Sequence, residues 1–210
     1  MRTEYHIEIT TNALQELFSK TALMLIIKSN ISQDRLTYQI WHDYIHFDGN
    51  AFKEGFEYIG EQNRLVLENV QGEQYPSAWE ALGRMTHSWQ DYYSHSNYIK
   101  LWLDRYGQVK PEEINHQDNV IMNHPDLRSG KNYGLLELMA TTKGLSKIFF
   151  PLIPPDSHAK MNLDGPDISP LFEYAYWAAL KQTQQVAHEI LGNLVKNNVG
   201  QGKIRLFTGK

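Results

Sequence analysis

Three residues with metal-ligand side chains, His87, Asp91 and His95, stand four positions apart near the middle of the chain. On an α-helix this spacing puts all three on nearly one face, because each step of four residues exceeds a full turn by only about 40°. The Cα atoms of His87 and His95 would lie about 12 Å apart at a rise of about 1.5 Å per residue. An imidazole nitrogen binds zinc at about 2 Å, so this span is long for two ligands of one ion. The spacing therefore predicts a polynuclear site, in which His87 and Asp91 hold one ion and His95 reaches a neighbouring one.

The alternative is a solvated helix face, since histidine and aspartate on helices are more often surface residues than ligands. The aromatic residues Trp89, Tyr92 and Tyr93 alternate with the three candidates and indicate that the helix packs against a core. The row alone does not decide between the two interpretations. The decision depends on whether other segments supply partner ligands.

Other segments do contain candidates. Asp34 and His46 are twelve positions apart, about three and a third helical turns, so both can face one cleft. An acidic residue such as Asp34 near a helix N-terminus is also favoured by the helix dipole alone. His6 lies just ahead of a predicted helix, where a lone histidine is more often a cap or surface residue. His158 lies in a later loop that also carries Asp164.

The composition limits the function classes. The 210 residues predict a single domain, 1–210, with a net charge of −4 and no lysine or arginine block. This argues against duplex DNA as a partner but not against an enzyme acting on a phosphate ester. The absence of cysteine excludes thiolate metal sites and a cysteine nucleophile. With no signal peptide and no apolar run long enough for a transmembrane segment, we expect a cytoplasmic protein by default, with non-classical secretion as the alternative.

Strand signals are nearly absent, so the predicted fold class is all-α, a single domain of six or seven helices. The apolar periodicity predicts helices over about 11–29, 33–41, 51–71, 76–98 with continuation to about 106, 135–147 and 171–197. Residues 107–132 and the proline-rich stretch that starts at Pro151 are expected to be loops. The tail from residue 200 to 210 is expected to be extended or frayed.

Three sequence stretches together resemble a known family. They are His6 with Ile9-Thr10 and Ala13-Leu14, then His46-Phe47-Asp48, and then His87-Ser88-Trp89-Gln90-Asp91-Tyr92-Tyr93-Ser94-His95-Ser96-Asn97. The combination resembles the Het-C group, which is related to the zinc-dependent bacterial phospholipases C and the single-strand-specific zinc nucleases. The resemblance covers the chain from about His6 to Asp164 and implies a phospholipase C/nuclease-like helical fold.

The resemblance also implies a ligand set for three zinc ions. One ion would be held by Asp34, His46, His87 and Asp91. Asp91 would bridge to a second ion that His6 also holds. The third would be held by His95, His158 and a carboxylate that follows His158.

The chain departs from the family pattern in two places. The enzymes place an acid four residues after the histidine that matches His158, whereas this chain has Asn162 there; Asp164 is therefore the predicted ligand, with Asn162 and Asp156 as lesser candidates. Secreted members also use the amino group and carbonyl of their first residue on the shared ion. Because five residues precede His6 here, that ion is expected to be less fully held or absent unless the chain is processed.

These features predict a metal-dependent phosphodiester hydrolase with two or three zinc ions, for which manganese or iron are substitutes. Asp34 is the candidate general base, and Asp43 or Asp48 are candidates for orienting ligand histidines from outside. A phospholipase C-like enzyme acting on a phosphoester such as a phospholipid, with peripheral membrane contact, is favoured over a nuclease. The alternatives are a non-catalytic, metal-stabilised effector or interaction module of the Het-C type, a nuclease, or a metal-assisted enzyme acting on a phosphorylated metabolite.

Overall fold

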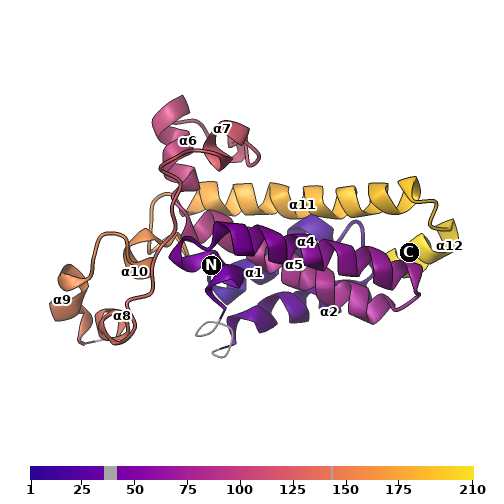
Figure 1. Cartoon of the computed structure of the whole chain (residues 1–210), viewed down its shortest axis with the longest axis horizontal. Helices are drawn as coiled ribbons and strands as arrows, with labels where there is room; N and C mark the ends of the chain where they lie inside the picture. Colours follow the sequence, from indigo (N-terminus) through magenta and orange to yellow (C-terminus); the bar gives the residue numbers. More distant parts are fainter. Residues whose placement is uncertain (36–41, 143) are drawn as a thin grey trace.

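The computed structural model describes residues 1–35, 42–142 and 144–210, and these residues form an all-α domain (Figure 1). The α-helices are α1 (Thr3–Leu14), α2 (Lys20–Ile31), α4 (Phe52–Gln71), α5 (Tyr75–His95), α6 (Tyr98–Tyr106), α7 (Asn119–Met122), α8 (Leu135–Thr141), α9 (Ser146–Phe149), α10 (His158–Met161), α11 (Phe172–Lys196) and α12 (Gln201–Thr208). Short 3-10 turns are η1 (Ser32–Asp34), η2 (Asp43–His46), η3 (Asp48–Asn50), η4 (Pro111–Glu113) and η5 (Phe150–Leu152). Within the described ranges no β-strand forms, and no helix is long and apolar enough to cross a membrane.

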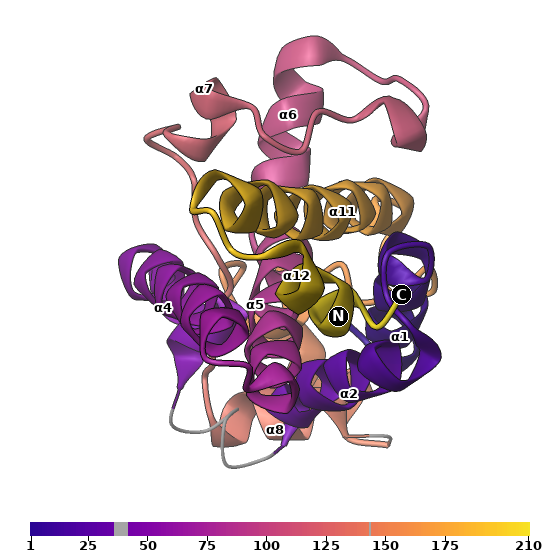
Figure 2. The same ribbon diagram turned by 90° about the vertical axis from the view of Figure 1, so that its right-hand side faces the viewer.

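Helix α5 lies at the centre of the bundle, with α2, α4 and α11 packed around it (Figure 2). Pro76 in its first turn is compatible with the helix start, because the missing N–H has no partner there. Small residues let the neighbouring helices approach. At Gly83 a Cβ atom would lie 2.3 Å from the carbonyl oxygen of Ile26, so the close crossing of α2 over α5 requires glycine. The central position of α5 explains why the side chains of its C-terminal half are buried on almost every face.

The predicted all-α class is confirmed, but several helix boundaries and the predicted count of six or seven helices are wrong. The described residues contain eleven α-helices: the predicted helices 11–29, 76–106 and 135–147 are each divided in two, and α7, α10 and α12 form in stretches predicted as loop or tail. The hydroxyl of Ser19 accepts a hydrogen bond from the Ala22 amide at 3.3 Å and starts α2 as a separate helix. Ser96 has extended backbone angles and ends α5 before α6 begins.

The tail also differs from the prediction, since residues 201–208 form α12. Phe207 is fully buried against Phe18, with ring centroids 5.3 Å apart, and Trp79 Nε1 donates a hydrogen bond to its carbonyl oxygen. Tertiary packing of one aromatic side chain therefore orders a segment with weak local signals. Of the predicted helix at 33–41, residues 36–41 lie outside the described part, and the preceding residues form η1.

Candidate metal centre

The row His87, Asp91 and His95 lies on one face of α5 and is buried. The two carboxylate oxygens of Asp91 face different neighbours. Oδ2 lies 2.8 Å from His46 Nδ1 and 3.0 Å from His87 Nε2, whereas Oδ1 lies 3.2 Å from His6 Nε2. A carboxylate in this arrangement can bridge two cations.

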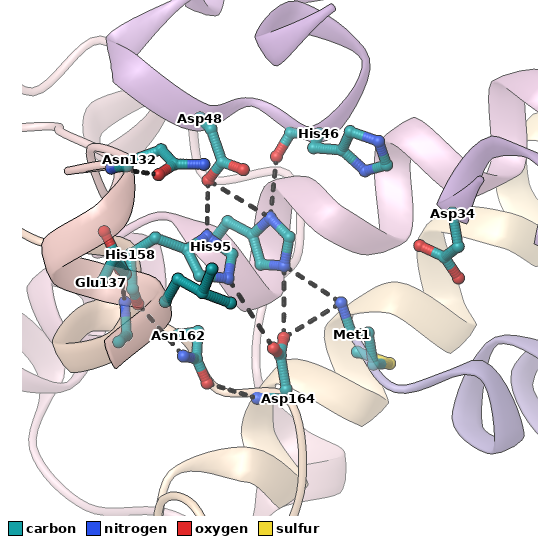
Figure 3. A pocket seen from close by; sticks show the side chains of 13 residues that line it. Met1, Asp34, His46, Asp48, His95, Asn132, Glu137, His158, Asn162 and Asp164 are labelled. Carbon is teal, nitrogen blue, oxygen red and sulfur yellow. Dashed lines mark hydrogen bonds and ion pairs between the residues drawn. The ribbon is translucent and has the colours of Figure 1, made fainter. Parts of the chain in front are cut away.

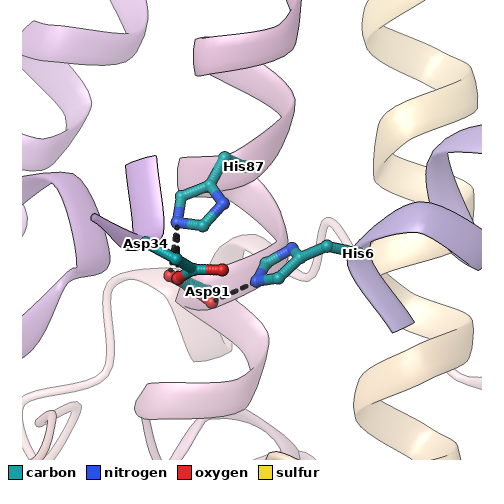
Figure 4. Close-up of side chains that lie close together, drawn as sticks. All are labelled: His6, Asp34, His87 and Asp91. Carbon is teal, nitrogen blue, oxygen red and sulfur yellow. Dashed lines mark ion pairs between the residues drawn. The ribbon is translucent and has the colours of Figure 1, made fainter. Parts of the chain in front are cut away.

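The Oδ2 side of Asp91 contains the first group of donors. His87 Nε2 is 3.2 Å from His46 Nδ1 and 3.7 Å from Asp34 Oδ1. Two ligands each about 2.1 Å from one tetrahedral zinc ion lie roughly 3.4 Å apart, which is close to these separations. The structure thus brings together Asp34, His46, His87 and Asp91, the four residues that the resemblance implied for one ion. It also places His6 close enough to join Asp34, His87 and Asp91 around one ion, with its ring stacked 4.3 Å from that of His87 (Figure 4).

The packing of Phe47 determines where His46 and Asp48 point. Phe47 has left-handed backbone angles (φ 56°) and is fully buried, with its ring 5.1 Å from that of Tyr92 and 5.1 Å from that of Phe56. This anchor holds the junction of η2 and η3 against α5. His46 on one side of the anchor therefore faces Asp91, and Asp48 on the other side faces His158.

The Oδ1 side of Asp91 contains His6, which was predicted to precede a helix but lies inside α1 and is fully buried. Gln90 orients its ring: Gln90 Oε1 lies 2.6 Å from His6 Nδ1 and accepts its hydrogen. With the hydrogen on Nδ1, the lone pair of Nε2 points toward Asp91. Nε2 makes no hydrogen bond within the described part of the chain, so this buried nitrogen is available to a cation.

A third group lies at the C-terminal end of α5, where His95, His158 and Asp164 meet (Figure 3). His95 Nδ1 lies 3.0 Å from the carbonyl oxygen of His46, which can only accept, so this nitrogen carries the hydrogen. His158 Nδ1 likewise lies 2.9 Å from Asp48 Oδ1. The Nε2 atoms of both rings consequently face Asp164, at 3.2 Å from Oδ1 and 4.0 Å from Oδ2. Asp48 therefore fits an outer carboxylate that orients a histidine.

The backbone of Gly130 fixes the position of His158. A Cβ atom at residue 130 would lie 2.5 Å from the Cα atom of His158, and the carbonyl oxygen of Gly130 accepts a hydrogen bond from Gly49 N at 2.7 Å. The segment at Gly130 thus holds η3 and α10 together. Glycine permits this close approach.

The lesser candidates for the late ligand are engaged elsewhere. Asn162 donates through Nδ2 to the His158 carbonyl oxygen at 3.1 Å. Asp156 lies 3.1 Å from Lys131 Nζ and accepts from the Tyr133 hydroxyl at 2.8 Å. The geometry favours Asp164, which reaches His95 because the backbone becomes extended after α10 ends at Met161.

The amino group of Met1 also reaches this centre. It lies 2.6 Å from Asp91 Oδ1, 3.0 Å from Asp164 Oδ1 and 3.1 Å from His95 Nε2. The five residues before His6 were expected to weaken the hold on the second ion. They do not keep the amino group away, because α1 begins at Thr3 and turns the first residue back toward α5.

The electrostatics of the centre follow from burial and crowding of charges. Burial raises the pKa of Asp34, and the nearby Asp91 carboxylate raises it further. Burial would also raise the pKa of Asp91, but the Met1 ammonium and the nearby histidines outweigh it and hold that pKa well below its usual range. Burial lowers the pKa of His87 well below 6.5, so this imidazole is neutral and able to donate a lone pair. Burial opposes protonation of His158, yet the Asp48 carboxylate raises the pKa of His158 to about 9.

Asp34 and His46 of the first group and all members of the third group line a cavity of about 640 Å³, whereas His6, His87 and Asp91 are fully buried and do not line it. Its lining is Met1, Asp34, His46, Asp48, His95, Asn132, Gly134, Glu137, Leu138, His158, Ala159, Asn162 and Asp164. Among the described residues that line it there is no Phe, Tyr or Trp. Tyr92, Tyr93 and Tyr98 are fully buried core residues.

Sequence reasoning missed two residues of this region. Gln90, next to Asp91, orients His6, and Glu137 from α8 lines the cavity and accepts from the Ala159 amide. No spacing pattern in the sequence indicates Gln90 or Glu137, because Gln90 contacts a residue of α1 and Glu137 a residue of α10. His116 and His188 lie outside the centre, one bonded to Gln185 and the other exposed on α11.

Comparison with known proteins identifies a family. Residues 5–121, more than half of the chain, match the VWA7 N-terminal domain. This range includes six of the eight candidate ligands and ends before His158 and Asp164. No curated protein and no solved structure matches the chain. On the extent of the family match, the chain belongs to the VWA7 N-terminal domain family.

Proposed function

We propose that this protein is a metal-dependent phosphodiester hydrolase of the phospholipase C type, with a polynuclear zinc site. The observation that carries the proposal is the buried Asp91 carboxylate, whose Oδ2 faces His46 and His87 and whose Oδ1 faces His6, next to a cavity lined by Asp34, His46 and Asp164. The resemblance of the sequence to the Het-C group supports the same assignment.

The donors fit zinc by their chemistry. They are imidazole nitrogens and carboxylate oxygens without thiolate, a set that also admits manganese or iron. The buried Nε2 of His6 makes no hydrogen bond in the described part of the chain, so it is an available ligand atom. On this basis Asp34, His46, His87 and Asp91 would hold one ion, Asp91 and His6 a second, and His95, His158 and Asp164 a third.

Divalent ions at these positions would supply Lewis acidity toward water and toward the oxygens of a phosphoester. The protein residues supply position and proton transfer. Asp34 lies at the cavity wall with a partly exposed side chain, so its carboxylate can reach a water molecule in the cavity. We therefore assign Asp34 the general-base role, in which its carboxylate orients a water molecule and takes its proton.

The cavity supports a phospholipid headgroup ester better than a nucleic acid. Single-stranded nucleic acids are bound by stacking on aromatic rings within basic grooves. The described lining contains no Phe, Tyr, Trp, Lys or Arg, and its apolar side chains are Met1, Leu138 and Ala159. A compact phosphoester with an aliphatic remainder matches these walls.

The test combines metal analysis with an activity panel. Purified protein should contain two or three zinc ions by elemental analysis and anomalous scattering, and should cleave short-chain phosphatidylcholine faster than single-stranded DNA. Asp91→Asn should remove two of the ions and the activity, whereas Asp156→Asn should retain all ions and the activity, because the Asp156 carboxylate is bonded to Lys131 and Tyr133. Less than one zinc per chain in the unaltered protein would refute the metal site.

A metal-stabilised module without catalysis is the second candidate. The donors come from α1, η1, η2, α5 and the segment around α10, so bound ions would tie separate elements together. Zinc at full stoichiometry with no cleavage of any phosphoester in the panel would favour this candidate.

A further inference from the structure

Exposed apolar side chains concentrate in one short part of the chain, the α8–α9 excursion, which we define as residues 135–152 and which contains α8, α9 and η5. Large apolar side chains here are 41–70% exposed. They are Leu135, Leu138, Leu145, Ile148, Phe150 and Leu152. Soluble proteins rarely expose so many neighbouring apolar groups without a binding role.

The excursion lies to one side of the helix bundle (Figure 1). Its three elements pack mainly against one another, whereas α1, α2, α4, α5 and α11 form the bundle. Sequence reasoning predicted one helix over 135–147 with an apolar stripe facing a core. The structure instead leaves Leu135 and Leu138 exposed, so these side chains do not serve the bundle core.

The excursion is continuous with the mouth of the cavity. Gly134, Glu137 and Leu138 line the cavity beside His158, and Leu138 is at the same time largely exposed. Glu137 connects the excursion to the centre by accepting from the amide of Ala159, the residue after His158. Whatever covers the apolar surface therefore also lies at the entrance to the candidate metal centre.

The charge of this region is opposite to that of the rest of the chain. Residues 128–160 carry five basic side chains against two acidic ones, a net charge of +3, whereas the whole chain has −4 and the remainder −7. Of the two acids, Glu137 is buried and Asp156 is paired with Lys131. The exposed Arg128, Lys147 and Lys160 form no ion pair within the described ranges. The region thus presents apolar side chains surrounded by uncompensated positive charge.

We propose that the α8–α9 excursion docks on an anionic lipid surface and places the cavity at the membrane interface. Aliphatic side chains that enter the headgroup boundary, flanked by basic residues that attract anionic lipids, are the features of interfacial membrane binding. Lysine is depleted at protein–protein interfaces, whereas Lys147 lies within the excursion and Lys160 lies close to it in the sequence. Docking would bring a lipid headgroup directly to the metal centre, and this consequence rests on the proposed function.

The test measures binding of the full chain to vesicles of phosphatidylcholine alone and of phosphatidylcholine mixed with phosphatidylserine. A chelator is present, so that binding does not depend on metal. We expect roughly tenfold tighter binding to the anionic vesicles, lost at high salt. The variants Leu135→Ser and Ile148→Ser should each weaken binding by about tenfold, because each withdraws one aliphatic side chain from the interface.

Matched controls lie on α2. Met24 is 63% exposed and Lys20 is exposed, both outside the excursion. Met24→Ser and Lys20→Glu should bind vesicles like the unaltered chain, whereas Lys147→Glu, with the same change in charge, should bind roughly tenfold more weakly. Unfolding followed by circular dichroism should show all five variants folded.

Three outcomes would overturn the proposal. The first is equal binding to neutral and anionic vesicles, and the second is weakening by the α2 variants as large as that by the excursion variants. The third is absence of vesicle binding together with a dimer that Leu135→Ser dissociates, which would assign the surface to a second copy of the chain. Activity on a water-soluble short-chain phosphodiester reports the proposed function separately. Vesicle binding without that activity would refute only the hydrolase, and activity without vesicle binding would refute only the docking.

Discussion

Replacement of Gln90 by leucine should weaken one ion of the centre selectively. Gln90 Oε1 lies 2.6 Å from His6 Nδ1 and holds the hydrogen on that nitrogen, so that Nε2 faces Asp91. The Gln90 amide nitrogen in turn donates to the hydroxyls of Thr10 and Thr183 at 3.1 and 3.2 Å. Leucine has a similar length but can neither fix the tautomer of His6 nor hold its ring in place.

The magnitude follows from these contacts. Loss of a partner that orients a ligand histidine lowers metal affinity about 10- to 100-fold, which is about 1.4 to 2.7 kcal/mol. Each buried hydrogen bond contributes about 1 kcal/mol net to folding, so loss of the contacts to His6, Thr10 and Thr183 should lower the free energy of unfolding of metal-free protein by roughly 2 to 4 kcal/mol. The loss of metal affinity concerns one ion, whereas the loss of unfolding free energy concerns the whole domain.

Gln182→Leu separates the two effects. Gln182 is another buried glutamine, and its Oε1 accepts from the Tyr93 hydroxyl at 3.3 Å and from Gln117 at 3.2 Å. Competition with a chromophoric chelator should report one weakened zinc ion in Gln90→Leu and none in Gln182→Leu, while urea unfolding in chelator should report destabilisation in both. If zinc affinity is unchanged in Gln90→Leu, or falls equally in both variants, the argument from the His6 tautomer is refuted.

Three further predictions concern the bridging carboxylate of Asp91, the crossing of α2 over α5 and the pKa of His158. Asp91→Asn should abolish binding of two ions, because the two oxygens of Asp91 face two donor groups. Asp164→Asn should weaken binding of only the third ion. Loss of equal numbers of ions from the two variants in native mass spectra would contradict the bridging role of Asp91. Gly83→Ala should lower the free energy of unfolding by at least about 2 kcal/mol, because the new Cβ atom would overlap the α2 backbone, whereas Gly60→Ala, on an open face of α4, should raise it by about 0.5 to 1 kcal/mol. The pKa of His158 is raised to about 9, so at neutral pH zinc must displace its proton, and zinc affinity should increase as the pH rises from about 6 toward 9. Calorimetry in two buffers of different ionisation enthalpy should detect the released proton, and a pH-independent affinity would exclude this origin.

The row on α5 was predictable from the sequence because helix geometry is local. A spacing of four residues fixes the relative directions of His87, Asp91 and His95 whatever surrounds them. The inference that His87 and His95 serve different ions needs only the rise of the helix. In the structure His87 lies nearest to Oδ2 of Asp91 and His95 nearest to Oδ1, and the assignment of the two histidines to different ions stays a prediction.

The positions of His6 and Asp164 were not predictable in the same way. The first turn of α1 has few apolar residues, and the helix is ordered by packing of Ile9 and Leu14 against the rest of the bundle. Asp164 approaches His95 because of the path of the backbone after α10, which sequence distance from His158 does not determine. Both residues depend on tertiary contacts between segments far apart in the chain.

The candidate metal ligands and the cavity wall formed by α8 come from different parts of the fold. Asp91, His87 and His6 lie on α1 and α5, inside the rigid bundle, where burial holds the side chains in place for ligands. Leu138 and Glu137 lie on α8, outside the bundle, and form the cavity wall nearest to the exposed apolar surface. Under the proposed function, changes in the α8–α9 excursion would alter the cavity wall, whereas His6, His87 and Asp91 belong to α1 and α5. His158 is the exception, since Glu137 holds the backbone next to it, and so the third ion is the one whose binding should respond to events at the excursion.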